Sequence, residues 1–222
     1  MNNWEPLFLS LKLSLITTFI LVLVGVPLAY WLSCTKIRMK PVFESIISMP
    51  LVLPPSVLGF YLLLAFSPNN FFGKFLDTHF NLRLVFSFEG LILASILYSL
   101  PFMIYPVQAG FQNLPTSLKE ASYTLGISPF RTFLKVMIPN IKPALLSGIV
   151  LTFAHTVGEF GVVLMIGGNI PGVSKVASIA IYDEVESMNY EAANFYAMVL
   201  VAVSFIVLFL LFWFNRKFER KI

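Results

Sequence analysis

The most regular feature of the sequence is a series of long apolar stretches without charged residues. Four of them lie between Lys12 and Lys36, Glu44 and Lys74, Glu89 and Lys119, and Glu191 and Arg216. Each is longer than the roughly 20 mainly apolar residues that a membrane-spanning helix needs. A fifth stretch, from Lys142 to Lys175, is interrupted only by Glu159. The pattern predicts five transmembrane helices, at about 7–32, 46–66, 90–110, 144–168 and 194–214.

The composition agrees with an all-α integral membrane protein that forms a single transmembrane domain over residues 1–222. Hydrophobic residues make up 58% of the chain and charged residues 12%, and the mean hydropathy is +0.84. These values exclude a soluble globular domain and a disordered chain. The single cysteine, Cys34, excludes a disulfide within the chain. The first apolar stretch is too long for a cleaved signal peptide, so it is expected to remain as a span.

The distribution of basic residues predicts the orientation of the chain. The connections on one side of the predicted spans carry eleven Lys and Arg residues, whereas those on the other side carry three, namely Lys74, Arg83 and Lys175. Lys12 lies at the start of the first span and can reach the outer interface. Because basic loops stay in the cytoplasm, the C-terminus is predicted inside and the N-terminus outside. The net charge of +4 therefore reports topology and not nucleic-acid binding.

The longest cytoplasmic connection, residues 111–143, carries the clearest local signals. Ser117 is followed three residues later by Glu120, a capping-box pattern that predicts a helix start. Gly126 is placed to end this helix. Pro129 then opens a second helix, and Pro139 is expected to stop it. The loop is predicted to be two short helices joined by a sharp bend and lying against the membrane. A helix pair that merely anchors the spans explains the periodicity equally well.

The spacing within this loop resembles the EAA loop of ABC importer permeases. The resemblance rests on Glu120, Ala121, Ser122, Gly126 and Pro139. Ser122 stands where the family usually has a second alanine, and the loop ends in Val-Met-Ile-Pro where the family usually has Ile-x-Leu-Pro. The resemblance implies that the loop docks into a groove on a cytoplasmic ATPase and couples ATP hydrolysis to transport. Glu120 would either cap its own helix or pair with a basic residue of the ATPase.

Three prolines fall inside the second predicted span, at Pro50, Pro54 and Pro55. Each removes a backbone donor and crowds the preceding turn, so together they predict a broken helix. A broken helix at membrane depth must be covered by protein or line a water-filled cavity. Pro54, Pro55 and the adjacent Ser56 are therefore candidates for the transport path or its gate. The alternative is a simple packing kink.

The fourth predicted span contains two titratable residues, His155 and Glu159, at helical spacing i, i+4. On a continuous helix they would share one face. A carboxylate inside the membrane is costly and is by default a functional candidate, while Gly158 and Gly161 would let another helix approach closely. These residues serve either a gate or pathway, or a contact that holds helices or subunits together. A proton relay is possible with these residue types.

No motif in the chain predicts catalysis or a resident cofactor. There is no phosphate-binding loop and no nucleophile motif. The only histidines, His79 and His155, are too few for a metal cluster. The chain is therefore expected to be a transporter subunit without enzymatic activity, cofactor or metal. Since the predicted spans are almost free of basic residues, a low-affinity path lined by hydroxyls and backbone dipoles is expected instead of a tight anion site.

Three further segments resemble the molybdate-type oxyanion permeases. They are residues 51–59 (LVLPPSVLG), 158–161 (GEFG) and 169–172 (NIPG). One departure is His155, where relatives often carry arginine. The resemblance implies a type I ABC importer permease fold in a bacterial inner membrane, with molybdate or tungstate as substrate.

The same resemblance implies a set of partners. Two copies of the chain would form a homodimer with the path between them, and two cytoplasmic ATPase subunits would hold the ATP and Mg. A periplasmic oxyanion-binding protein would deliver substrate to an outer mouth formed partly by residues 67–89 and 169–193. Membrane lipid is the remaining partner, and no nucleic acid is expected.

Two other functions remain open. A sulfate or thiosulfate ABC permease is a close relative of the molybdate branch, although the short chain favours molybdate. A proton-coupled secondary transporter would use His155 and Glu159. The odd number of spans argues against the inverted repeats that are typical of that class.

Overall fold

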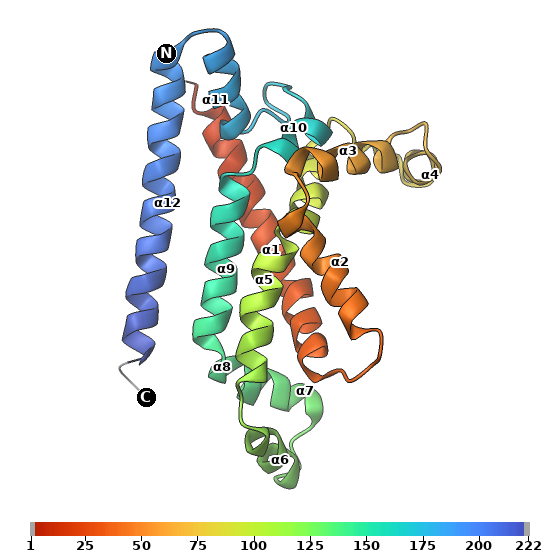
Figure 1. The fold of residues 1–222 in the computed structure, drawn as a ribbon, viewed down its shortest axis with the longest axis vertical. Helices are drawn as coiled ribbons and strands as arrows, with labels where there is room; N and C mark the ends of the chain where they lie inside the picture. Colours follow the sequence, from red (N-terminus) through yellow and green to blue (C-terminus); the bar gives the residue numbers. More distant parts are fainter. Residues whose placement is uncertain (1–2, 220–222) are drawn as a thin grey trace.

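The computed structural model describes residues 3–219, and in this part of the chain all regular structure is helical. Figure 1 shows a long bundle with a shorter lateral arm formed by α3 and α4. The elements are α1 (Glu5–Cys34), α2 (Lys40–Val52), α3 (Pro55–Phe66), α4 (Phe71–Phe80), α5 (Phe88–Gln112), α6 (Thr116–Thr124), α7 (Pro129–Thr132), a π-helical turn (Phe133–Met137), α8 (Ile138–Asn140), α9 (Lys142–Val157), α10 (Gly161–Gly167), α11 (Ala177–Glu186) and α12 (Tyr190–Glu219).

Three of the five predicted spans are continuous helices. Helices α1, α5 and α12 contain the predicted ranges 7–32, 90–110 and 194–214, and each is long and apolar enough to cross a membrane. The prediction of five spans holds only if each of two bent helix pairs is counted as one span, α2 with α3 and the segment from α7 to α8 with α9.

The second span is broken where its prolines predict. Helix α2 ends at Val52 and α3 begins at Pro55, and the two helices are bent by 114°. The predicted break within 46–66 is therefore confirmed. Pro50 is accommodated within α2, whereas Pro54 and Pro55 lie at the bend itself.

The prediction of one continuous helix over 144–168 is wrong. Helix α9 ends at Val157, and α10 begins only at Gly161. The intervening residues Gly158–Phe160 are not helical. Because no proline marks this second break, the apolar pattern alone gave no sign of it.

Helices α1, α5 and α9 pack together at the centre of the bundle (Figure 1). Small residues let these helices approach: a Cβ added at Gly25 would lie 3.0 Å from Cγ of Met103, and one at Gly148 would lie 3.1 Å from the Met103 carbonyl oxygen. Two apolar clusters fill the interior, one around Leu91 and Val162 and the other around Leu21 and Met103. Helix α12 lies at the side, against α9 and α11.

Segments that were predicted to lie on opposite sides of the membrane are found at opposite ends of the bundle. The N-terminus and α11 lie at one end, whereas α6 and α7 lie at the other (Figure 1). The predicted outer segment 169–193 and the predicted cytoplasmic loop 111–143 therefore occupy opposite ends. Arg220 and Lys221, which contribute to the predicted inner charge, lie outside the described residues.

The cytoplasmic loop does fold into short helices around a sharp bend, but its first cap differs from the prediction. Helix α6 begins at Thr116 directly after Pro115 and has no side-chain cap, so Ser117 already lies within the helix and no capping box forms. The predicted end is confirmed at Gly126, which has a φ of +72°. Glycine adopts this left-handed conformation without steric cost.

The second helix extends one residue past Pro139, which was expected to stop it. The helical path continues through α8 to Asn140. A π-helical turn, Phe133–Met137, lies directly before it. A π-helical turn widens the hydrogen-bonding ring by one residue, which relieves the clash between a proline ring and the carbonyl of the preceding turn. The path then bends by 79° into α9.

Candidate functional site

The two broken spans meet at their breaks. A Cβ added at Gly161 would lie 2.8 Å from Cβ of Pro55 and 3.3 Å from the Ser56 nitrogen, and one at Gly59 would lie 2.7 Å from Cβ of Met165. Helices α3 and α10 thus pack with their backbones close together. Five predicted pathway residues come together at the breaks, namely Pro54, Pro55, Ser56, Glu159 and Gly161. Gly158 lies at the same break and is exposed, and within the described chain a Cβ there would meet only its own helix, 3.9 Å away, so Gly158 makes no close helix contact inside this chain.

This packing gives a matched pair of glycine substitutions. Gly161→Ala is expected to destabilise the chain by about 1–3 kcal/mol, because the new methyl group would overlap Pro55 and force the helices apart. Gly158→Ala is expected to have little effect, since a methyl group there has room. Thermal unfolding of the two purified variants in detergent measures the difference. Equal melting temperatures would contradict the close approach of α3 and α10.

Glu159 is buried at the break between α9 and α10, with 4% of its surface exposed. Neither carboxylate oxygen accepts a hydrogen bond of ordinary geometry in the described chain, although the Ser95 hydroxyl lies beside the carboxyl group. Ser95 on α5 is fully buried, and its hydroxyl makes no hydrogen bond of ordinary geometry either. A buried carboxyl group without such a hydrogen bond costs free energy. The Glu159 carboxyl group therefore does not stabilise this conformation.

His155 belongs to a different environment from Glu159. Its ring stacks on Phe102 at a centroid distance of 3.9 Å, and its Nδ1 lies 2.9 Å from the Ser99 hydroxyl. Because α9 ends at Val157, the i, i+4 spacing no longer places His155 and Glu159 on one face. The two side chains form no ion pair in the described structure. A direct proton relay between them therefore has no support in this geometry.

The main chain at the break is held from the outer segment. The Ser178 hydroxyl on α11 donates a hydrogen bond of 2.5 Å to the Glu159 carbonyl oxygen. The ring of Tyr182, one turn further along α11, lies 5.3 Å from the ring of Phe160. Sequence reasoning missed both residues, because a lone serine and a lone tyrosine in a connecting segment carry no motif.

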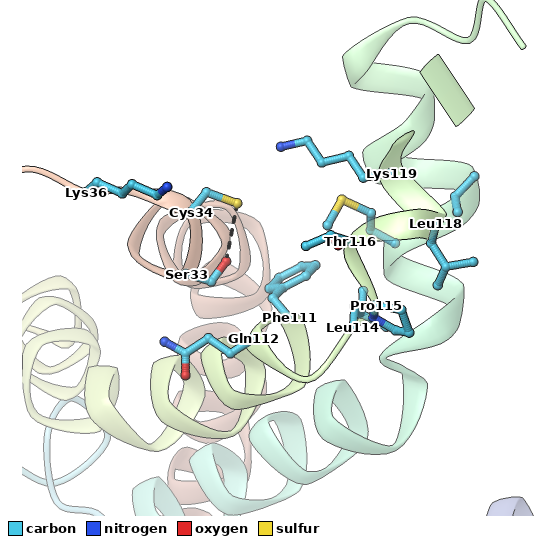
Figure 2. Close-up of a pocket in the computed structure, with 12 residues that line it drawn as sticks. Ser33, Cys34, Lys36, Phe111, Gln112, Leu114, Pro115, Thr116, Leu118 and Lys119 are labelled. Carbon is cyan, nitrogen blue, oxygen red and sulfur yellow. Dashed lines mark hydrogen bonds between the residues drawn. The ribbon is translucent and has the colours of Figure 1, made fainter. Parts of the chain in front are cut away.

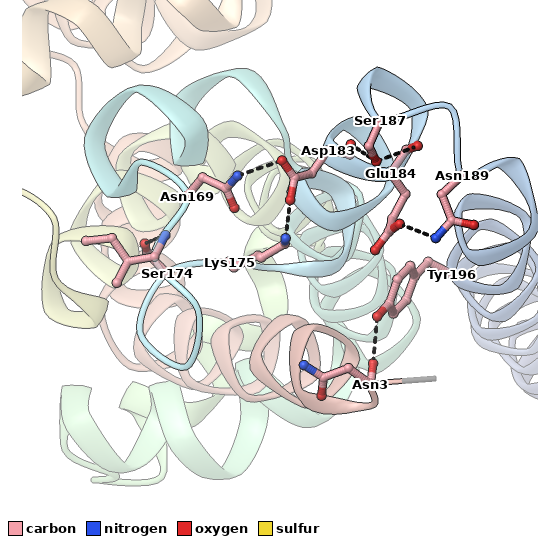
Figure 3. A network of polar contacts seen from close by, with 10 residues as sticks. Asn3, Asn169, Ser174, Lys175, Asp183, Glu184, Ser187, Asn189 and Tyr196 are labelled. Atoms are coloured by element: carbon pink, nitrogen blue, oxygen red, sulfur yellow. Dashed lines mark hydrogen bonds and ion pairs between the residues drawn. The ribbon is translucent and has the colours of Figure 1, made fainter. Parts of the chain in front are cut away.

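A polar network ties the outer segment together (Figure 3). Asp183 accepts a hydrogen bond of 3.0 Å from Asn169 and an ion-paired hydrogen bond from Lys175. At the edge of the same region, the Tyr196 hydroxyl of α12 donates to the Asn3 carbonyl oxygen over 2.8 Å. The hydrogen bond from Lys175 lowers the pKa of the Asp183 carboxyl below its ordinary value of 3.8, and Asn169 acts in the same direction.

This lowered pKa predicts how stability depends on pH. Ionised Asp183 stabilises the folded chain at pH values above its ordinary pKa, and this contribution is lost as the pH falls through the lowered folded pKa. Asp183→Asn should therefore melt at a lower temperature than the parent at pH 7, with the gap closing towards pH 3. Glu191→Gln, at another exposed acidic position, is the control. A gap that stays constant with pH would contradict the assignment.

The candidate coupling surface is formed by α6 and α7. Glu120 and Ala121 are exposed, and so are the apolar side chains of Leu125 (78%) and Phe130 (71%). Ser122 is buried and donates 2.9 Å to the Leu118 carbonyl oxygen. A small residue is needed at this position because it faces the inside of the loop. The exposed part of the surface is free to receive another protein.

Behind this surface, α6 borders a pocket of about 380 Å³ between the ends of α1 and α5. Figure 2 shows Lys36, Cys34, Lys119 and Phe111 among the residues that line it. The pocket leaves α6 partly separated from the membrane helices. Pro139 lies in α8, outside the pocket lining, and is exposed.

Comparison with known proteins identifies related chains. The family model "binding-protein-dependent transport system inner membrane component" matches residues 22–222. The molybdenum transport system permease protein ModB of Azotobacter vinelandii is 43% identical over 95% of this chain and 93% of its own length. The sulfate transport system permease protein CysT of Salmonella typhimurium is 32% identical over 89% of this chain and 71% of its own length.

Solved structures share the fold. An inward-facing structure of the MetNI methionine ABC transporter matches 96% of this chain and 94% of its own with a TM-score of 0.72 at 18% identity. A bacterial ABC transporter that imports the polysaccharide alginate matches 97% of this chain and 80% of its own with a TM-score of 0.74 at 14% identity. The overall helical arrangement is therefore that of an ABC importer permease.

Proposed function

Because this chain belongs to the binding-protein-dependent transport system inner membrane components, we propose that it carries molybdate across the inner membrane as the permease of an ATP-driven importer. The membrane location and the role as a non-enzymatic permease subunit follow from the family. The substrate, the coupling to ATP hydrolysis and the assembly are the proposed part.

The observation that carries the choice of substrate is the 43% identity with a molybdenum permease over nearly the full length of both chains. The sulfate permease of Salmonella typhimurium is less similar, and this chain covers only 71% of it. Tungstate shares the charge and tetrahedral shape of molybdate, so the same path would carry it. The permease would discriminate weakly, and the binding protein would select the anion.

The geometry supports a path of low affinity. The core at the breaks offers hydroxyl groups and main-chain dipoles, together with the Glu159 carboxyl group and, on α9, the His155 ring, and Lys12 lies near the outer end of α1. A dianion would therefore pass without a strong counter-charge, which allows release as well as entry. Two copies of the chain would enclose this path, since α2 and α3 expose apolar side chains beside the breaks, among them Val52, Phe60 and Tyr61.

The cytoplasmic partner would be an ATPase that receives α6 and α7. It would supply the ATP and Mg, and this chain would hold no cofactor of its own. Exposed Ala121 lets a partner approach the helix backbone closely, and the exposed Leu125 and Phe130 offer apolar area for burial. A periplasmic binding protein would meet the opposite end of the bundle.

The test is reconstitution of the complex purified from its native membrane. We expect an ATPase to co-purify, and we expect its activity and anion uptake in proteoliposomes to rise with a molybdate-loaded binding protein. Stimulation by a sulfate-loaded protein alone would reassign the substrate. Uptake by the isolated chain under a proton gradient, without an ATPase, would overturn the importer assignment.

A further inference from the structure

The outer segment that contains the short helix α11 is connected to both ends of α10. At the start of α10 the connection is the hydrogen bond from Ser178 to the Glu159 carbonyl oxygen. At its end the Ser174 hydroxyl donates 2.5 Å to the Gly167 carbonyl oxygen. Asn169, just beyond, donates to Asp183 of α11. The outer segment therefore brackets the whole of α10.

The Ser178 contact has a particular role because of where the helix breaks. Helix α10 takes Phe160 as its N-terminal cap, and the Phe160 carbonyl oxygen accepts from Leu164 at 2.9 Å. The Glu159 carbonyl, one residue earlier, lies outside both helices. A carbonyl freed at membrane depth must find another donor, and the Ser178 hydroxyl supplies it.

A second contact joins the same elements. The Tyr182 ring lies 5.3 Å from the Phe160 ring, and its hydroxyl donates 2.7 Å to Glu186 on α11. The ring is thereby held to α11 at one side and to the break at the other. Tyr182 is only partly buried, so the contact begins at the outer surface and ends beside Glu159.

We propose that Ser178 is a positioning residue that, together with Tyr182, transmits docking of the loaded binding protein on the outer surface to the α9–α10 break. The proposal rests on the proposed function. Movement of α11 by a docked protein would pull on the Glu159 main chain and on Phe160. Since α10 packs against α3 at Gly161 and Pro55, the movement would reach both broken spans together.

The test uses the intact complex in proteoliposomes with the Ser178→Ala variant. Three quantities are measured: basal ATP hydrolysis, the affinity for the loaded binding protein, and the stimulation of hydrolysis by that protein. We expect stimulation to fall about fivefold, the size that one lost hydrogen bond allows. Basal activity and docking affinity should stay close to those of the parent. If Ser178 only stabilised the fold, basal activity and docking affinity would fall together with stimulation.

Two further variants serve as controls. Ser187→Ala removes a serine of the same segment whose hydroxyl bonds only to Asp183 and Glu184 nearby, and it should leave stimulation unchanged. Ser178→Thr keeps the hydroxyl and should restore stimulation. If Ser178→Ala prevents assembly, stimulation is measured in the Tyr182→Leu complex instead. Tyr182 is partly exposed, so the chain is expected to tolerate this substitution. Stimulation at the parent level in the variant used for this measurement overturns the proposal.

The same experiment separates this proposal from the proposed function. If the parent complex is stimulated and the Ser178→Ala complex is stimulated equally, the importer assignment stands and the role of Ser178 is wrong. If the parent complex responds to no loaded binding protein, the importer assignment itself fails and the role of Ser178 fails with it.

Discussion

Ala121→Trp is expected to abolish ATP-driven uptake while the permease remains folded in the membrane. Ala121 is exposed on α6, so an indole at this position can extend into solvent without a buried site having to hold it. It would instead hold off any protein that packs closely against α6. A single steric block at the centre of an interface can cost several kcal/mol, which corresponds to a loss of more than about hundredfold in affinity.

The measurement is co-purification of the ATPase with the tagged permease, followed by uptake in vesicles. Ala121→Ser adds one oxygen atom and should behave like the parent, which separates the effect of bulk from that of sequence change. The membrane level of the permease is measured in parallel. Uptake at the parent rate in the Trp variant would show that the α6–α7 surface is not where the ATPase acts.

The second large effect is expected at Glu159. Glu159→Gln keeps the size of the side chain but cannot carry a negative charge. In this conformation the carboxyl group is buried and accepts no hydrogen bond of ordinary geometry. Removal of the charge should leave the thermal stability unchanged or raise it, because an uncompensated buried charge is a cost to the fold. Transport should nevertheless fall by about tenfold or more, if the carboxyl group finds its partner in another state of the transport cycle.

Two measurements on the same preparation check this expectation: the melting temperature of the complex and the initial rate of uptake per complex. Glu191→Gln, at an exposed acidic position on α12, is the matched control. A lower melting temperature with unchanged uptake per complex would mean that Glu159 holds the subunits or helices together and has no part in transport.

The sequence predicts continuous apolar helices better than it predicts the breaks within helices. Helices α1, α5 and α12 are long uninterrupted apolar stretches, so hydropathy alone places them. The bend at Pro54 and Pro55 was predictable because proline acts through its own ring. The break at Gly158–Phe160 was not, because its freed carbonyl is satisfied by Ser178, nineteen residues away in sequence.

The candidate site shows the same division. The packing of Gly161 on Pro55 was foreshadowed by glycine and proline within apolar spans. The predicted pairing of His155 with Glu159 failed because it assumed a continuous helix. The capping box at Ser117 failed because Pro115, which fixes its own φ, takes the N-cap position two residues earlier. The end of the second cytoplasmic helix was misplaced because a π-helical turn absorbs Pro139.

The position of α12 at the side of the bundle has a consequence for how the chain inserts into the membrane during synthesis. The two main apolar clusters of the described structure contain no residue after Ile179. The last helix therefore adds little to the interior, and only 6% of its most apolar window is buried. The ribosome synthesises the chain from its N-terminus, so the central helices can pack in the membrane before α12 has been translated. The final helix then inserts by its own hydrophobicity and docks through Tyr196 onto the finished outer end.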